Sequence, residues 1–189
     1  MGGVFPLLLF AIAVPLFPGQ TRGSLLRFDG MVVGSTLIGQ DFTGREWFQP
    51  RPSAAGAGYD ATASGGTNLA PGNRMLAEGG SGFIGIRSLA KEYRRRNGLS
   101  PDTPIPIDAV TRSGSGLDPD ISPANALLQV ARVARARNLP ETTVRRLVEE
   151  RVVRPQLGFL GDPRVSVLEL NLALLHLQRE PSAASQSGP

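Results

Sequence analysis

The sequence predicts a mixed α+β protein, in which an apolar N-terminal helix precedes one small α/β domain. Two observations lead to this prediction. The turn signal Asp29-Gly30 separates two short segments rich in β-branched and apolar residues, which is the pattern of a β-hairpin. Further along, apolar residues recur at helical spacing after Ser122-Pro123 and again after Pro140, which indicates amphipathic helices.

The composition allows one folded domain with an accessory segment. The chain has 189 residues, of which 41% are hydrophobic, so it can build a core. We expect an apolar segment at residues 1–18, the folded domain at 19–180 and a polar, disordered tail at 181–189. The chain has no cysteine and its only histidine is His176, which excludes disulfides, Cys-based zinc sites and any site that needs two imidazoles.

The charge pattern favours solvated helix faces over a nucleic-acid surface. The formal net charge is +4, and Lys91 is the only lysine among 20 basic residues. Basic residues gather at 87–96 and 132–154. Arginine heads on exposed helix faces explain both clusters, and no nucleic-acid-binding module is recognisable in the sequence.

The N-terminal run VFPLLLFAIAVPLF, residues 4–17, is uncharged over 14 residues. As a helix it would span about 21 Å, less than the roughly 30 Å of a bilayer's hydrocarbon core. A secretory signal is disfavoured because no basic residue precedes Arg22. Three alternatives stay open on these grounds: the outer part of a membrane helix whose start is absent, a short intact anchor, or a buried core helix.

The next segments predict a hairpin followed by an ordered loop. Residues 24–40 match a β-hairpin around its Asp-Gly turn. Residues 41–73 are rich in Gly, Ser and Pro, which predicts irregular structure. Trp47, Phe48 and Tyr59 are expected to pin this loop to the core, since unanchored linkers rarely carry aromatic residues.

Local end signals place the remaining elements. Residues 87–97 form a predicted helix closed by Gly98, and residues 104–111 form a predicted short edge strand. Ser122 is the expected N-cap of a helix with proline at its first position. Ser166 begins a capping box before the last helix. The apolar faces of the last three predicted helices are expected at Leu127, Val130, Ala131, Ala134; Val144, Leu147, Val148, Val152; and Leu170, Leu174, Leu177.

No catalytic centre is predicted. Ser88 and Lys91 match an S-x-x-K pattern, but the K-T-G element of such enzymes would need a second lysine. His176 lies in a leucine-rich helical segment, where a structural histidine is favoured over a general base. Residues 66–73 contain two glycines ahead of Asn73, which stands where a P-loop would have its lysine, so no P-loop is present.

A Gly/Ser loop precedes the Ser122 helix. Ser113-Gly114-Ser115-Gly116 could offer backbone N–H groups to an anion, although many such loops are simple turns. Asp118 and Asp120 follow this loop. We interpret these carboxylates as turn-forming groups and favourable charges near a helix N-terminus, because a metal site would require more oxygen ligands at defined spacing.

Six tracts together resemble the C subunit of Kdp-type potassium-transporting ATPases, from about Phe17 to Leu174. The tracts are GSTLIGQDF at 34–42, WFQPRPSA at 47–54, SGGTNL at 64–69, VTRSGSGLDPDISP at 110–123, QVARVARAR at 129–137, and GDPRVSVL at 161–168 with LNLAL at 170–174. Two departures stand out. About a dozen residues of the family's membrane helix are expected to be missing before residue 1, and Pro71-Gly72-Asn73-Arg74 replaces the usual Pro-x-Asn-Pro.

The resemblance implies a non-catalytic, single-pass inner-membrane subunit with its domain on the extracytoplasmic side. Its implied partners are a channel-like potassium-translocating subunit, a P-type ATP-hydrolysing subunit and a very small fourth subunit; nucleic acid is not a partner. The implied role is a catalytic chaperone that raises the ATP affinity of the hydrolysing subunit.

No covalent cofactor or metal is implied, and ATP would act through the complex. The implied nucleotide-related residues are Ser113, Gly114, Ser115, Gly116 and Gln129. Two alternatives stay open: a structural cap at the potassium entrance, where Asp118 and Asp120 would attract K⁺, and a free extracytoplasmic module that binds an anion.

Overall fold

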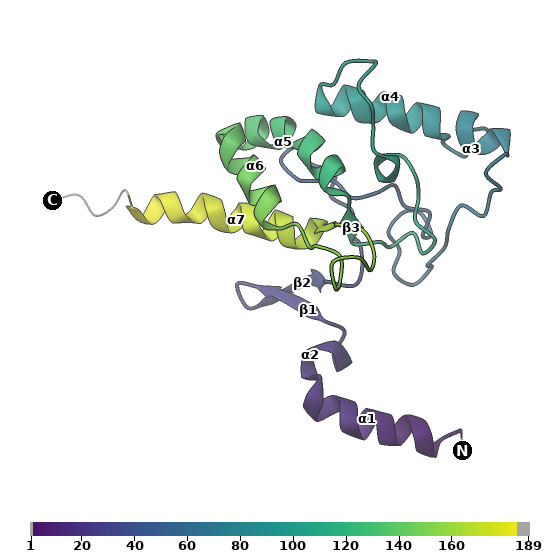
Figure 1. Ribbon diagram of the computed structural model, residues 1–189, viewed down its shortest axis with the longest axis vertical. Coiled ribbons are helices and arrows are strands. Elements are labelled where there is room, and N and C mark those ends of the chain that lie inside the picture. Colours follow the sequence, from purple (N-terminus) through teal and green to yellow (C-terminus); the bar gives the residue numbers. More distant parts are fainter. Residues whose placement is uncertain (1, 185–189) are drawn as a thin grey trace.

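The computed structural model describes residues 2–184, and the side chains of residues 2–178. It is a mixed α+β structure, as the sequence predicts (Figure 1). Three helices form the centre of the domain: α5 (Pro123–Arg137), α6 (Glu141–Glu150) and α7 (Val167–Ala184). Two small antiparallel pairs join β1 (Leu25–Phe28) to β2 (Met31–Ser35) and β3 (Asp120–Ile121) to β4 (Val165–Ser166).

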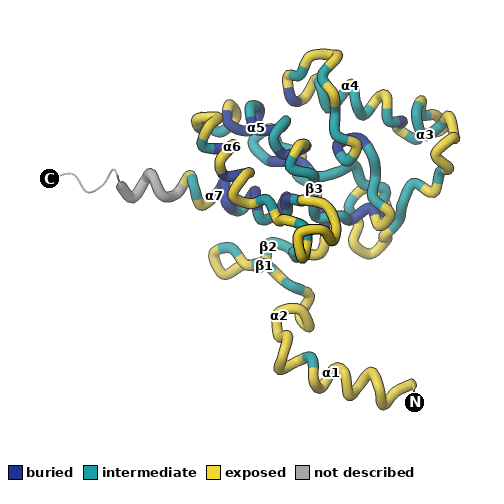
Figure 2. The backbone as a smooth tube through the Cα atoms, viewed as in Figure 1, coloured by how far each residue is buried: buried dark blue, intermediate teal, exposed yellow. Residues whose placement is uncertain are grey.

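The hydrophobic core lies between the three central helices and the β3–β4 pair. Part of each predicted apolar face is buried in it, the predicted Leu127 and Val152 pack against it half-buried, and Phe48 joins it from the long loop. The buried residues that the predicted faces include are Val130, Ala134, Val144, Leu147, Val148, Leu170 and Leu174. Figure 2 shows this buried centre surrounded by exposed loops and an exposed N-terminal helix. The fully buried members of the cluster are Phe48, Ile121, Ala126, Val130, Val133, Val144, Val148, Val165, Leu170 and Leu174.

The helix ends follow the predicted signals. The Ser122 hydroxyl accepts a hydrogen bond from Asn125 N at 3.1 Å, and Pro123 occupies the first helical position. In the last helix, Ser166 Oγ accepts from Glu169 N at 3.4 Å. Each side chain therefore satisfies one of the donors that a helix start leaves without an intrahelical partner.

The N-terminal run forms α1 (Val4–Leu16), followed by the short α2 (Pro18–Thr21). No residue of α1 is buried, which contradicts the alternative of a buried core helix. Of the residues that the structure describes, none belongs to a helix long and apolar enough to cross a membrane. With 13 residues, α1 is about 20 Å long. This exposed apolar helix is therefore shorter than the roughly 30 Å hydrocarbon core of a bilayer.

The predicted hairpin is confirmed, with Leu25 paired to Ser35 at one end and Phe28 to Met31 at the other. Asp29 and Gly30 form its two-residue turn with φ values of 50° and 79°. Two consecutive positive φ values match the type I′ turn, whose twist suits a two-stranded ribbon. His176 on α7 contacts the Phe28 ring edge-on, with ring centroids 5.0 Å apart.

The middle of the chain contains α3 (Arg74–Glu78) and α4 (Ile86–Asn97), and no helix or strand is present from Asp41 to Asn73. Gly98 ends α4 with φ 67°, as predicted. Asn73 Oδ1 accepts from Met75 N at 2.9 Å, so α3 starts at the predicted departure from the family's sequence pattern.

The strand predicted at residues 104–111 is wrong. This segment contains the 3₁₀ helix η1 (Ile107–Ala109), closed by the bonds from Ala109 N to Pro106 O and from Val110 N to Ile107 O. Pro104 and Pro106 have no N–H to donate to a sheet, so a local turn is the alternative that satisfies the following amides. As for the predicted tail, α7 extends through residues 181–184, and 185–189 lie outside the described residues.

Candidate functional site

The long loop at residues 41–73 is fastened to the helices by amide side chains. Asn171 on α7 bonds both backbone groups of Phe48: its Oδ1 accepts from Phe48 N and its Nδ2 donates to Phe48 O, each at 2.9 Å. Asn171 and Phe48 are fully buried. The Asn171 amide therefore supplies the Phe48 backbone with the two hydrogen bonds that a neighbouring strand would supply in a sheet.

Gln129, the predicted nucleotide-related residue on α5, lies at the centre of this fastening. Its Oε1 accepts from Gln49 N at 2.8 Å and from Arg132 Nη2 at 2.7 Å. Its Nε2 donates to Gln49 O and to Asn125 Oδ1, both at 3.0 Å. An amide has two donor hydrogens and two acceptor lone pairs. All four positions are used within the protein, and only 1% of the Gln129 surface is exposed.

Arg132 extends this network to the start of the loop. Its Nη1 donates to Arg45 O at 2.6 Å and to Trp47 O at 3.0 Å, and its Nε donates to Asn97 Oδ1 at 2.8 Å. The Arg132 side chain is buried with carbonyl and amide oxygens as its hydrogen-bond partners. Burial, with a smaller contribution from nearby Arg96, lowers the pKa of Arg132 to about 10, so the group stays charged at neutral pH.

A second polar cluster joins α4, η1 and the start of α5. The Asp108 carboxylate accepts from Ser122 N and Ser122 Oγ, both at 2.8 Å, and from Asn125 Nδ2 at 2.9 Å. Tyr93 OH donates to Asn125 Oδ1 at 2.7 Å. Burial raises the pKa of Tyr93, which keeps this phenol protonated as a donor.

The predicted loop at Ser113–Gly116 packs against the long loop. Ser115 O accepts from Gly65 N at 2.9 Å, and Gly116 O accepts from Ser53 Oγ at 2.6 Å. Gly116 has φ 71°, and a Cβ there would lie 2.5 Å from Gly65 O. Glycine is required at this position by both conformation and space.

The two halves of the predicted site have different hydrogen-bond partners. The loop at 113–116 bonds to residues 53–65, whereas Gln129 bonds to Gln49, Asn125 and Arg132. Ser115 is exposed and Gln129 is buried. The sequence analysis did not identify Gln49, Asn171 and Arg132 as residues that bind the long loop to the helices. One sequence feature could have indicated this role: the polar residues Asn125, Gln129 and Arg132 recur at helical spacing on the buried side of α5.

Asp118 and Asp120 form ion pairs across the domain. Asp118 Oδ2 lies 2.7 Å from Arg51 Nη1, and Asp120 Oδ2 lies 2.9 Å from Arg164 Nε. Asp118 Oδ1 also accepts from Asp120 N at 3.0 Å, which is the turn role expected from the sequence. Within the described part of the chain, no group of three or more His, Asp or Glu side chains is arranged to hold a metal ion.

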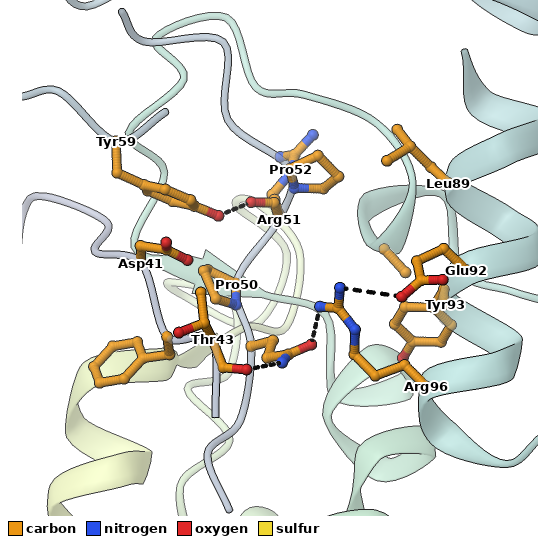
Figure 3. Close-up of a pocket in the computed structure, with 13 residues that line it drawn as sticks. Asp41, Thr43, Pro50, Arg51, Pro52, Tyr59, Leu89, Glu92, Tyr93 and Arg96 are labelled. Atoms are coloured by element: carbon orange, nitrogen blue, oxygen red, sulfur yellow. Dashed lines mark hydrogen bonds and ion pairs between the residues drawn. The ribbon is translucent and has the colours of Figure 1, made fainter. Parts of the chain in front are cut away.

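A pocket of about 180 Å³ lies between the long loop and α4 (Figure 3). Figure 3 shows Asp41, Arg51 and Tyr59 on one side and Glu92, Tyr93 and Arg96 on the other. The Arg96 side chain links α4 to the long loop, because its Nη1 donates to Gln49 Oε1 at 2.6 Å.

Arg96 also lines a neighbouring pocket of about 270 Å³ at the C-terminal ends of α4 and α5. Five arginines surround this pocket: Arg45, Arg95, Arg96, Arg132 and Arg135. Arg95 and Arg96 form ion pairs with Glu92, and neither Arg45 nor Arg135 forms one among the described residues. The arginines face two helix C-termini, whose dipoles offset part of the positive charge.

These features define a small mixed α+β domain, whose buried polar side chains hold its own irregular loops in place. The family model described as "K+-transporting ATPase, c chain" matches residues 1–176. The chain therefore belongs to the KdpC family.

Individual relatives agree with the family model. The chain is 51% identical over 187 residues to the potassium-transporting ATPase KdpC subunit of Caulobacter vibrioides strain NA1000, covering 98% of this chain and 89% of that protein. It is 53% identical over 175 residues to the KdpC subunit of Nitratidesulfovibrio vulgaris, covering 91% and 84%. The KdpC subunit of Mycobacterium bovis strain BCG is 49% identical over 173 residues, covering 92% and 88%.

Proposed function

We propose that this chain is a non-catalytic accessory subunit of an ATP-driven potassium uptake complex, and that its domain is a structural cap on the extracytoplasmic side. It would assemble with a potassium-translocating subunit, a P-type ATP-hydrolysing subunit and a small fourth subunit. Family membership supports the accessory role. The exposed apolar helix α1 supports attachment to a membrane.

The observation that favours a structural cap over direct nucleotide contact is the saturated amide of Gln129. Its four hydrogen-bonding positions are occupied by Gln49, Asn125 and Arg132, and its side chain is buried. A ligand could bind the Gln129 amide only by displacing Gln49, Asn125 or Arg132 from it. Such a displacement would cost free energy, because the buried groups that now bond Gln129 would lose a hydrogen-bond partner.

A cysteine introduced at Ser115 tests the location of the domain. The chain has no native cysteine and Ser115 is exposed, so a Ser115→Cys variant would carry a single accessible thiol. We expect a membrane-impermeant maleimide to label this thiol only from the extracytoplasmic side of sealed vesicles. Labelling only from the cytoplasmic side would overturn the proposed topology.

The chaperone role that raises ATP affinity is a second candidate, with nucleotide contacts at Ser113, Gly114, Ser115, Gly116 and Gln129. The arginine-lined pocket favours it, since Arg132 joins that pocket to Gln129 at 2.7 Å. Guanidinium groups bind phosphates well.

The kinetic test is Arg135→Gln in the whole complex, with Arg145→Gln on α6 as the control. A raised KM for ATP in the Arg135 variant alone would support the chaperone candidate. Unchanged kinetics in both variants would leave the structural cap as the better account. Copurification tests the remaining alternative, an anion-binding module that does not assemble with the other subunits. That alternative predicts that the membrane-attached chain fails to copurify with them.

A further inference from the structure

The segment between α6 and β4, residues 153–164, forms a hairpin closed by backbone hydrogen bonds, and the proposed function assigns it no role. Val153 and Arg164 exchange two backbone hydrogen bonds at 2.8 and 3.0 Å, and Gln156 and Leu160 exchange two more at 3.0 and 2.9 Å. We call this segment the 153–164 hairpin and residues 157–160 its tip. Arg164 also forms an ion pair with Asp120, which holds the base of the hairpin to β3.

The tip exposes large apolar side chains. Leu157 is 82% exposed, Phe159 is 74% exposed and Leu160 is 49% exposed. No charged residue lies between Pro155 and Gly161. Exposed apolar residues are common singly, but three neighbouring ones on a fixed projection are typical of a contact surface.

Leu157 gives the strongest indication, because its backbone is in the left-handed region with φ 52°. This conformation costs a residue with a bulky side chain about 1–2 kcal/mol, whereas glycine adopts it readily and asparagine tolerates it. The Leu157 side chain gains little burial within the domain in return, because the residue is 82% exposed. A residue that is strained, apolar and exposed is unfavourable for folding alone, which points to a function for its side chain.

We propose that the tip of the 153–164 hairpin docks into an apolar pocket on another subunit of the same transport complex. This inference rests on the proposed function. In Figure 1 the segment before β4 lies on the side of the domain from which β1, β2 and α1 extend, and Figure 2 shows it as exposed. The hairpin therefore lies on the side that an anchored α1 would turn toward membrane-embedded subunits.

The charges around the tip favour a protein partner over a lipid surface. Arg154 and Asp162 flank the tip and carry opposite charges, so this part of the hairpin has no net charge. Loops that bind anionic membranes carry several basic residues without matching acids. The backbone bonds also fix the shape of the tip, as suits a pre-formed pocket; a fluid bilayer makes no such demand.

The test is Leu157→Asn in the full chain, assembled with the other subunits in detergent. Asparagine tolerates the left-handed conformation but removes the apolar side chain. We expect the isolated variant to keep or raise its Tm and to bind the remaining subunits about thirty-fold more weakly, the loss typical of a central interface residue. Phe159→Ser should weaken binding similarly. Ile107→Ala, which changes a residue 76% exposed on η1, is the matched control and should leave binding unchanged.

A single cysteine at the tip identifies the partner. Leu157→Cys carrying a photoreactive maleimide should crosslink to a protein subunit of the complex. Crosslinks to lipid alone, or wild-type affinity in both the Leu157→Asn and Phe159→Ser variants, would overturn the docking proposal while the accessory role stands. If the wild-type chain itself fails to associate with the other subunits, the proposed function is wrong and not the hairpin assignment alone.

Discussion

Replacing Gln129 by alanine separates a structural amide from a ligand-binding one. In the native protein this amide makes four hydrogen bonds, all to buried or half-buried groups. Its removal would leave Gln49 N, Gln49 O and Arg132 Nη2 without these partners, whereas Asn125 Oδ1 would keep its bond from Tyr93. A buried polar group without a partner costs about 1–3 kcal/mol.

Three such groups give about 3–9 kcal/mol before relaxation. Water entering the space left by the side chain would recover part of this. We therefore expect Gln129→Ala to lower the free energy of unfolding by about 3–5 kcal/mol, a large part of the 5–15 kcal/mol that holds a typical domain together. Most surface substitutions change stability by less than about 0.5 kcal/mol, so exposed Gln156→Ala is the control.

The assay is urea unfolding followed by tryptophan fluorescence. Trp47 is the only tryptophan, and its carbonyl accepts from Arg132 Nη1 at 3.0 Å, so the probe lies in the fastened loop. A loss of less than about 1 kcal/mol, accompanied by a weaker ATP dependence of the complex, would refute the structural argument and favour nucleotide contact at Gln129.

Three further predictions follow from the same geometry. Gly116→Ala should destabilise the domain by about 2 kcal/mol or more in urea unfolding, because a Cβ would lie 2.5 Å from Gly65 O, whereas Gly114→Ala has open space and should be nearly neutral. Ser122→Ala should lower stability by about 1–2 kcal/mol through loss of the N-cap, measured in the same way. Burial raises the pKa of Asp120 despite its arginine partner, so this carboxyl's contribution to stability is full below its unfolded pKa and is lost as pH rises through the folded one. The free energy of unfolding of wild type minus that of Asp120→Asn should therefore fall as pH rises from about 3 to 7, and a rise in this signed difference would contradict the argument.

Local signals in the sequence were sufficient where the structure is local. Asp29-Gly30, Gly98 and Ser122 each determine the backbone within a few residues, and each predicted element end is present. The segment at 104–111 was mistaken for a strand because alternating prolines resemble an edge-strand pattern. The sequence alone did not show that Asp108 bonds the start of α5, which favours a turn at this point.

The loop-fastening network was beyond prediction for a different reason. Gln129 and Gln49 are 80 residues apart, and Asn171 and Phe48 are 123 apart. Helical periodicity shows that such a side chain faces the core, but it does not identify the backbone group that the side chain meets there. A buried glutamine in an amphipathic helix therefore resembles a ligand-binding residue until its partners are known.

Gly116 and Leu157 together shift the search for function from the Gly/Ser loop to the hairpin. Both have φ in the left-handed region. At Gly116 the residue type follows from packing, because any side chain would collide with Gly65 and Ala55. At Leu157 packing does not explain the residue type, since the side chain is 82% exposed. Glycine or asparagine would adopt this backbone conformation at a lower cost in free energy. Folding accounts for the glycine but not for the leucine, so the leucine is the residue whose role must lie outside the chain.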